Sequence, residues 1–332
     1  MRRFVELHSC PYKLVLTSSA PSGPGRSVER ECAINTSPGC GNLAVDEAAA
    51  ASGARSDRRT VTRIELPPTE KPEEWLDAAT WPPVADPEHS VNAAFPWNKF
   101  DPLSYQRHHY EHLVEDDRRI LDLAGQFLAT RTREEPRRGI DMGAGSNLYP
   151  ALAMLPLCEE LTLMDLSTPN ADWLRTEIKD YAPSWDPFWE VLAQHEPYRT
   201  FPEDPRHALR DRTRVRQGDI FQTDPGEQWD IGTMFFVAES ISMVGVEFAK
   251  AVGAFLGCLR PGSPFVTAFM AGSQGYEVAG RRFPAVPIDE HHVGGVLRHY
   301  GVEDPSLYRI GIHEQLRPGY DGMILAMGQV SG

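Results

Sequence analysis

Two glycines and one aspartate have the residue types and the spacing of a nucleoside-binding site. Gly143 and Gly145 form a Gly-x-Gly sequence directly after a short apolar segment. Such a turn needs glycines because the chain bends tightly and a ligand approaches the backbone, where a Cβ atom would collide. Asp165 lies 20 residues beyond Gly145, after a second apolar segment, where a carboxylate can accept both hydroxyls of an adenosine ribose. The alternative is that Asp165 caps a helix, which Ser167 could do instead.

A further pair of residues extends this pattern from the ribose to the base. Asp219 and Ile220 follow a third short apolar segment. At this position an aspartate can accept a hydrogen bond from the exocyclic amine of adenine, and an isoleucine can cover the ring. The alternative is an ordinary turn, in which Gly-Asp pairs are common. Leu148 stands where a dinucleotide fingerprint has its third glycine, so the pattern favours S-adenosylmethionine over NAD.

Aromatic residues precede the glycine turn, and their spacing does not fit an apolar stripe along one face of a helix. Tyr105 and Tyr110 are five residues apart and therefore do not lie on one face of a helix. A lid across the mouth of the cofactor site would use both side chains. We therefore expect a lid helix at the start of the domain.

Four segments occur in the order found in one known family. Phe100 to Tyr110 has the pattern FxPxxYxxxxY, Asp141 to Tyr149 has DxGxGxxxY, and Asp165 to Asn170 has DxSxxN. With a fourth match from Pro264 to Pro284, residues 97–330 resemble the nicotinamide, phenylethanolamine and thioether or indolethylamine methyltransferases. The resemblance implies the class I methyltransferase fold, S-adenosyl-L-methionine as cofactor and a small-molecule acceptor.

The resemblance also implies which residues bind the cofactor. Gly143 and Gly145 would line its methionine part, Asp165 would bind the ribose, and Asp219 and Ile220 would bind adenine. The side chains implied to hold the methionine part are Tyr105, Tyr110, Tyr149 and Asn170.

Three residues bear on the acceptor. Tyr276 stands where the family has a tyrosine in its substrate pocket. Relatives that bind amines have an acid at the end of the fifth strand, where we place Phe269, so the resemblance does not favour nicotinamide or phenylethanolamine as the acceptor. Glu239 is the remaining candidate acid, with exposure at the surface as the alternative. A general base is required only if the nucleophile is protonated, and Glu239 and the Tyr276 hydroxyl are our catalytic candidates.

Alternating apolar and amphipathic segments would position these residues. Residues 113–128 have apolar side chains on one face and predict an amphipathic helix. Strands are expected at 139–143, 161–164, around 215, 231–236 and 265–269, and further helices at 169–180 and 246–259. This alternation predicts a Rossmann-like α/β fold with a mostly parallel sheet and helices on both faces. The segments 307–312 and 323–327 predict an antiparallel strand near the C-terminus.

The pattern also predicts how the chain is divided. Residues 1–68 have no sustained hydrophobic period and read as a disordered extension, or as the product of a misplaced start codon. Residues 69–96 form a lead-in segment, and residues 97–332 form the methyltransferase domain.

Composition excludes several classes of protein. The formal net charge of −14 disfavours a nucleic-acid binder, and the basic run from Arg206 to Arg216 is interspersed with acidic and polar residues and reads as a solvated segment. The 5 cysteines include no CxxC pair, and His108, His109 and His112 lack zinc-ligand spacing, so we expect a reducing compartment and no metal. With no run of 18 apolar residues and a poor fit to a signal peptide, we expect a cytoplasmic protein without a membrane partner.

We therefore predict an enzyme, an S-adenosylmethionine-dependent methyltransferase that modifies a nitrogen, oxygen or sulfur atom of a small molecule. Two alternatives come from other classes. An NAD-linked oxidoreductase also needs glycine turns and a ribose-binding acid. A catalytically silent adenosine-binding regulatory protein would keep the same cofactor residues.

Overall fold

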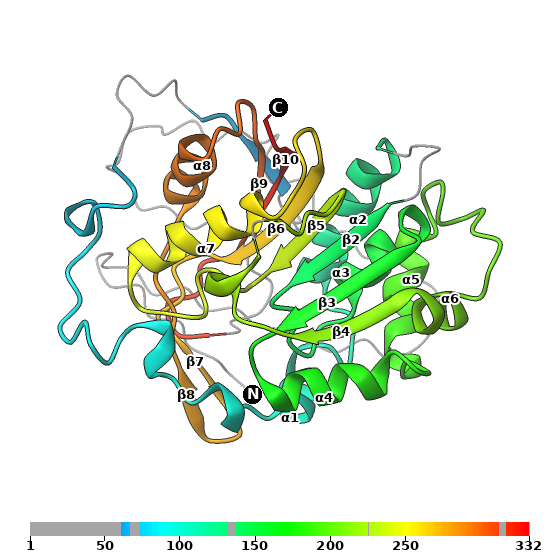
Figure 1. Cartoon of the computed structure of the whole chain (residues 1–332), viewed down its shortest axis with the longest axis horizontal. Coiled ribbons are helices and arrows are strands. Elements are labelled where there is room, and N and C mark those ends of the chain that lie inside the picture. Colours follow the sequence, from blue (N-terminus) through cyan, green and yellow to red (C-terminus); the bar gives the residue numbers. More distant parts are fainter. Residues whose placement is uncertain (1–60, 67–73, 132–136, 225, 312–316, 332) are drawn as a thin grey trace, which may run out of the picture. The chain divides into compact units, whose positions relative to one another are not determined.

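An eight-stranded sheet forms the centre of the computed structural model (Figure 1). The structure describes residues 61–66, 74–131, 137–224, 226–311 and 317–331. The strand order is β1-β9-β10-β6-β5-β2-β3-β4. The strands are β1 (Val61–Ile64), β2 (Arg138–Met142), β3 (Glu160–Asp165), β4 (Thr213–Gln217), β5 (Ile231–Phe235), β6 (Pro264–Met270), β9 (Ser306–Ile310) and β10 (Met323–Gln329).

The sheet is mostly parallel. Strand β2 pairs in parallel with β3 and β5, β3 with β4, and β5 with β6. Strand β10 runs antiparallel to both β6 and β9. Every residue of β5 and β6 is buried, as expected of central strands covered on both faces. The order from β9 to β4, with antiparallel β10 between β9 and β6, confirms the predicted class I methyltransferase fold.

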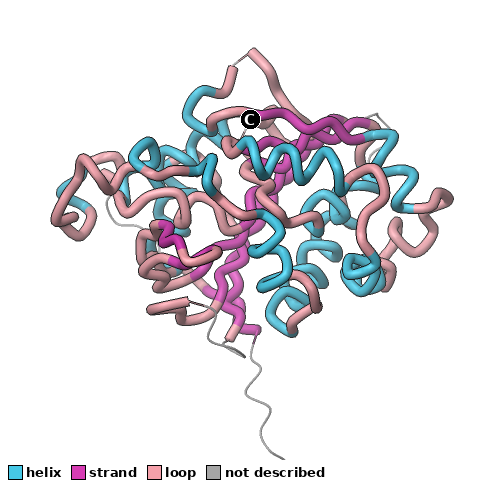
Figure 2. Tube along the Cα trace, turned by 90° about the horizontal axis from the view of Figure 1, so that it is seen from below, coloured by secondary structure: helices cyan, strands magenta, loops and turns pink. Residues whose placement is uncertain are grey.

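Helices cover both faces of the sheet, and the strands run between them in Figure 2. On one face, residues of α2, α3 and α5 share a core with Leu163 of β3, whereas on the other face residues of α7 and α8 share a second core with Met164. These neighbours face opposite ways because side chains alternate along a strand. The helices are α1 (Pro102–His109), α2 (Glu115–Ala129), α3 (Tyr149–Met154), α4 (Thr168–Glu177), α5 (Asp186–Leu192), α6 (Pro205–Arg212), α7 (Gly245–Gly257) and α8 (Glu290–His299).

The predicted disordered extension differs from the structure at its end. Val61–Ile64 form β1, which pairs antiparallel with β9 at the edge of the sheet. The prediction was wrong for these four residues because an edge strand with two half-buried ends carries too short an apolar pattern to be recognised. Residues 1–60 and 67–68 of that prediction lie outside the described residues.

The described part of the predicted lead-in segment packs on helices α7 and α8. The ring of Trp81 lies 5.8 Å from that of Phe248 in α7, and both Trp75 and Trp81 are buried. A Cβ atom at Gly245 would lie 1.9 Å from Trp81, so glycine is required for this close contact. The segment thereby brings the following chain to the carboxyl ends of the parallel strands.

Two further features matter for the site. A short hairpin of β7 (Tyr276–Val278) and β8 (Arg281–Phe283) was not predicted, because each strand is only 3 residues long. Arg206 to Arg216, predicted as a solvated segment between elements, instead forms α6 and most of β4. Within the described residues, no helix is both long and apolar enough to cross a membrane.

Candidate functional site

A pocket opens at the carboxyl ends of the parallel strands, where open α/β sheets bind their ligands. Its empty volume is about 810 Å³, including the part that is open to solvent. Residues after β2, β3, β4 and β5 form its floor, and residues of α1 and β7 contribute to its cover. The predicted site residues that line it are Tyr105, Tyr110, Gly143, Gly145, Asp165, Asn170, Asp219, Ile220 and Tyr276.

The glycine turn after β2 has the geometry that the spacing predicts. Gly143 and Gly145 have φ angles of 72° and 58°, which residues other than glycine rarely adopt. The Gly143 and Ala144 amides donate to the Met164 carbonyl at 2.8 and 2.9 Å. A Cβ atom at Gly143 would lie 2.5 Å from a methyl group of Val237. The turn thus requires glycine for its backbone angles and for its packing.

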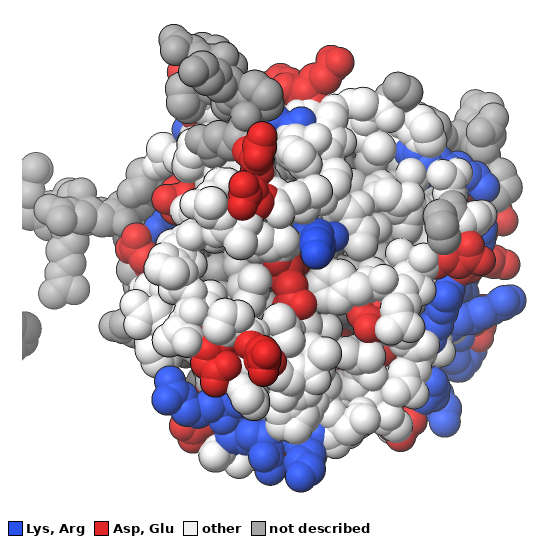
Figure 3. Space-filling model, turned by 60° about the vertical axis from the view of Figure 1, so that its left-hand side comes forward, with Lys and Arg blue, Asp and Glu red and all other residues white. Residues whose placement is uncertain are grey.

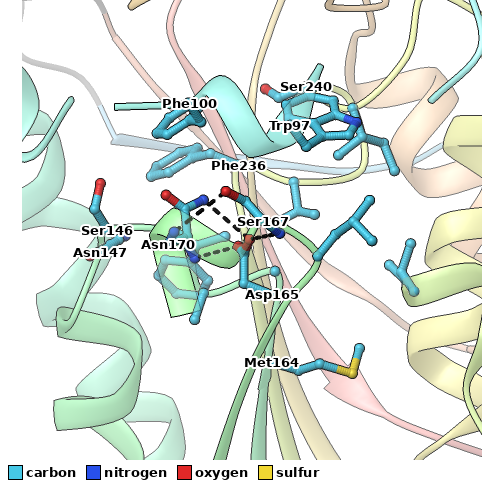
Figure 4. Close-up of a pocket in the computed structure, with 18 of the residues that line it drawn as sticks. Trp97, Phe100, Ser146, Asn147, Met164, Asp165, Ser167, Asn170, Phe236 and Ser240 are labelled. Atoms are coloured by element: carbon cyan, nitrogen blue, oxygen red, sulfur yellow. Dashed lines mark hydrogen bonds between the residues drawn. The ribbon is translucent and has the colours of Figure 1, made fainter. Parts of the chain in front are cut away.

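Asp165 is held at the end of β3 by three hydrogen bonds (Figure 4). Its carboxylate accepts from the Gly145 amide at 2.8 Å, the Ser167 amide at 2.8 Å and the Asn170 side-chain amide at 3.1 Å. Burial raises the pKa of Asp165 above its usual value, against the lowering effect of these donors. Ser167 caps α4 by accepting from the Asn170 amide, so Asp165 is not the helix cap of the alternative interpretation.

Three polar side-chain atoms in the pocket lining lack partners. Ser146 Oγ, Asn147 Nδ2 and Asn170 Oδ1 are buried without a hydrogen bond to any described residue. A buried polar group without a partner is costly, so these atoms mark a place for a polar ligand. The sequence analysis missed Ser146 and Asn147, although both directly follow the glycine turn.

Asp219 and Ile220 lie in the pocket at the end of β4. Asp219 also accepts from the Phe221 amide at 2.9 Å and from the Gln222 side chain at 3.2 Å. It therefore caps a short 3-10 helix, as the turn interpretation expects, while it also faces the pocket. The turn interpretation is thus observed, and adenine binding by Asp219 stays a prediction.

Aromatic side chains from three segments cover the pocket. Tyr105 of α1 lies 6.0 Å from Tyr110 and 6.1 Å from Tyr276 of β7, measured between ring centroids. Phe283 of β8 stacks on Trp97 at 5.3 Å and on Tyr276 at 5.6 Å. Short elements far apart in the sequence thus form one aromatic cover. Sequence reasoning identified the tyrosines but missed Trp97.

Tyr149 does not line the pocket, so the expectation that it holds the methionine part of the cofactor was wrong. Its ring is fully buried and stacks on Phe188 at 5.4 Å, and its hydroxyl donates to Asp117 at 3.0 Å. The side chain lies on the inner face of α3, among core residues of α2 and α5. Burial places the pKa of the Asp117 carboxyl at about 7, although the hydrogen bond from Tyr149 lowers it.

Glu239 and Phe269 also lie outside the pocket lining. Glu239 is fully buried, and its Oε1 accepts from the Met270 amide at 3.0 Å and from Ser240 Oγ at 3.1 Å. Burial raises the pKa of this carboxyl. Phe269 packs against Phe248 at 5.7 Å on the α7 face of the sheet, so the expectation that it replaces an acid in the pocket was wrong. Strand alternation directs Phe269 away from the face of α2.

Arg317 is a buried residue of the site that the sequence analysis missed. Its Nη1 donates to Ser240 Oγ at 2.9 Å, and its Nη2 donates to the Tyr105 hydroxyl at 3.0 Å. The guanidinium carbon lies 4.4 Å from the centre of the Tyr276 ring. From sequence, an arginine between apolar segments is expected to be exposed to solvent. Only the tertiary structure therefore reveals that Arg317 is buried.

The histidines do not gather into a metal site in the part of the chain described. There, no group of three or more His, Cys, Asp or Glu side chains is arranged to hold a metal ion. His109 instead packs against Tyr105 at 4.3 Å, and burial together with Arg317 lowers its pKa to about 3.

Several solved methyltransferase structures are similar to this chain. A magnesium protoporphyrin IX methyltransferase from Synechocystis is 13% identical, with a TM-score of 0.43 over 70% of this chain and 93% of that chain. An S-adenosylmethionine-dependent methyltransferase from Clostridium acetobutylicum is 10% identical, with a TM-score of 0.41 over 66% and 93%. An N-methyltransferase from Bradyrhizobium japonicum, solved with S-adenosyl-L-homocysteine, is 14% identical, with a TM-score of 0.38 over 69% and 99%.

The sequence itself identifies the family. No curated protein sequence matches the chain. The profile of the NNMT/PNMT/TEMT family matches residues 89–320, which is more than half of the chain and contains all the residues that line the pocket. The chain therefore belongs to the NNMT/PNMT/TEMT family.

Proposed function

We propose that the protein transfers a methyl group from S-adenosyl-L-methionine to a nitrogen, oxygen or sulfur atom of a small molecule. The observation that carries this proposal is Asp165, which is fixed beside the glycine turn at the end of β3 in a member of a methyltransferase family. The pocket is concave and lined by aromatic and apolar side chains with a few polar groups, as is typical of small-molecule sites.

The residues present fit this cofactor. Asp165 has carboxylate lone pairs beyond its three protein donors and would accept the ribose hydroxyls. Asp219 and Ile220 would bind adenine at the end of β4. The unpartnered atoms of Ser146, Asn147 and Asn170 would bind the polar methionine end, with Tyr105 and Tyr110 closing over it.

When bound, S-adenosylmethionine supplies an electrophilic methyl group on a sulfonium. The protein would align the acceptor with this methyl group and exclude water. The aromatic cover of Trp97, Tyr105, Tyr276 and Phe283 is suited to both tasks, because its rings are held against one another. Alignment would therefore carry most of the catalysis.

The two catalytic candidates would have different roles. Burial raises the pKa of Tyr276 well above its ordinary value, so its hydroxyl stays protonated and donates to the Ser240 carbonyl at 3.4 Å. The Tyr276 ring would serve as a wall of the acceptor site. Glu239 would accept a proton only through Ser240, which lines the pocket and donates to its carboxylate. We assign Glu239 as the base for an acceptor that is protonated at neutral pH.

A small-molecule acceptor is also supported by the surface. Arg206 pairs with Asp186 at 2.5 Å, Arg210 pairs with Asp211 at 2.8 Å, and Arg216 pairs with Glu227. These acids offset the basic run that would otherwise attract phosphates. The face in Figure 3 has acidic and basic side chains near its centre, and the larger groups of basic side chains lie toward its lower and right-hand margins.

Transfer of a labelled methyl group tests the function. The wild-type protein, supplied with labelled S-adenosylmethionine and a small-molecule extract, should label low-molecular-weight products, and Asp165→Ala should not. Cofactor binding without any labelled product would favour the silent adenosine-binding alternative. Binding of NAD in place of S-adenosylhomocysteine would favour the oxidoreductase.

A further inference from the structure

A positive charge lies at the acceptor end of the pocket. In the sheet order, β4, β3 and β2 lie on one side of β5 and carry the residues assigned to adenine, ribose and methionine. Ser240 follows β5, and Tyr276 begins β7. Arg317 contacts both residues and the Tyr105 hydroxyl, so its buried guanidinium lies directly behind this part of the pocket wall.

The compensation of the Arg317 charge is indirect, because the Glu239 carboxyl reaches it by way of Ser240. The side chain is only 3% exposed, and among the described residues no carboxylate forms an ion pair with it. It contacts the hydroxyls of Ser240 and Tyr105 and the ring of Tyr276, and its Nε has no hydrogen-bond partner in the part of the chain that the structure describes. A buried guanidinium is costly unless an anion pairs with it.

Two other arginines of the described chain contact a carboxylate directly. Arg206 also lies over a tyrosine ring, that of Tyr181 at 4.3 Å, but it contacts Asp186 at 2.5 Å. Arg309 is partly buried and contacts Glu290 at 2.8 Å. The Glu239 carboxyl is linked to Arg317 by way of Ser240.

We propose that the methyl acceptor carries an anionic group, such as a carboxylate, which Arg317 binds beside Ser240 and Tyr276. Guanidinium groups recognise carboxylates through charge-assisted hydrogen bonds. The surrounding aromatic rings fit a flat acid, whereas an amine would bring a second positive charge next to a buried one. This inference rests on the proposed function, because it assigns the substrate class of the same pocket. The other possible source of the anion is the carboxylate of the cofactor itself.

The test uses three probes that share a ring and differ in charge. Benzoate, benzamide and benzylamine are titrated by calorimetry into the full-length protein saturated with S-adenosylhomocysteine. We expect benzoate to bind at least about tenfold more tightly than benzamide, and benzylamine to bind most weakly. Equal affinities, a preference for benzylamine, or no binding of any probe at millimolar concentration would overturn the proposal.

Variants distinguish the sources of the anion. Arg317→Gln should abolish the preference for benzoate, and Arg317→Lys should retain part of it, while S-adenosylhomocysteine affinity stays within about threefold. Arg206→Gln is the matched control and should change neither. A tenfold loss of S-adenosylhomocysteine affinity in both Arg317 variants, with unchanged melting temperatures, would assign the anion to the cofactor and overturn the proposal. Failure of the wild-type protein to bind S-adenosylhomocysteine would instead refute the proposed function.

Discussion

Asp165 has a structural role and a proposed binding role. Its carboxylate orders the glycine turn and the start of α4, and it is assigned to the ribose. We expect Asp165→Ala to weaken S-adenosylhomocysteine binding at least about a hundredfold, because two charge-assisted hydrogen bonds of about 1.5–3 kcal/mol each are lost. Calorimetry measures the change.

The control for this substitution is Asp172→Ala in helix α4, where the side chain is exposed. Asp165→Asn, measured alongside, keeps one acceptor oxygen and guards against a variant that simply fails to fold. Affinity of Asp165→Ala within threefold of the wild-type value would refute the ribose assignment.

Glu239 provides a second test that changes a single residue. Glu239→Gln retains an oxygen that can accept from Met270 and Ser240 but cannot take up a proton. For an acceptor that is protonated at neutral pH, we expect methyl transfer to fall about 10²-fold or more, with S-adenosylhomocysteine affinity unchanged. The wild-type rate should rise with pH through the raised pKa of Glu239, and this rise should be absent in the variant. Identical pH profiles would exclude Glu239 as the base.

Helix α2 carries a buried carboxyl that should make stability depend on pH. The folded-state pKa of Asp117 is about 7, above its ordinary value of 3.8, because burial disfavours the charged form. The folded protein therefore binds more protons than the unfolded chain between these values, and stability should fall as pH rises from about 4 to about 7. Asp117→Asn keeps an acceptor for Tyr149 and should reduce this fall.

The measurement is the melting temperature of both proteins between pH 4 and pH 8. At pH 8 the variant should melt at a temperature equal to or above that of the wild type, since it avoids a cost of about 1.4 kcal/mol per unit of pKa shift. An unchanged pH dependence, with the exposed Asp172→Asn as control, would contradict the assigned burial effect.

The elements differ in how far the sequence could predict them. The strands β2, β3, β5 and β6 were predicted close to their observed positions, because buried parallel strands are continuously apolar. The hairpin β7–β8 and the edge strand β1 have only 3 or 4 residues per strand, which is too few for a period to emerge.

The site was predictable where its chemistry depends on neighbours in sequence. Gly143, Gly145 and Asp165 belong to local strand-end motifs, and the structure brings them together. Arg317 depends on contacts with Tyr105 and Ser240, which are 212 and 77 residues away, and no local pattern reports such contacts. For the same reason, spacing alone did not separate Tyr149, which packs in the core, from the tyrosines of the pocket.

At the scale of the whole molecule, the position of the pocket predicts which part of the chain is needed. The described residues that line it fall between Asn92 and Tyr276. We propose that residues 1–60 are dispensable for binding, and deleting them should leave S-adenosylhomocysteine affinity unchanged. Deleting residues 1–66 should lower the melting temperature by several degrees, because it removes β1 from the edge of the sheet. Equal melting temperatures for the two deletions would show that β1 contributes nothing to stability.

The central claim is that the pocket binds S-adenosylmethionine. Its most direct test is calorimetric titration of the wild-type protein with S-adenosylhomocysteine and, separately, with NAD, supported by melting temperatures. We predict saturable binding of S-adenosylhomocysteine alone, with stabilisation of about 2.7 kcal/mol when the ligand is at a hundred times its Kd. Binding of NAD alone, or of neither ligand, would contradict the account.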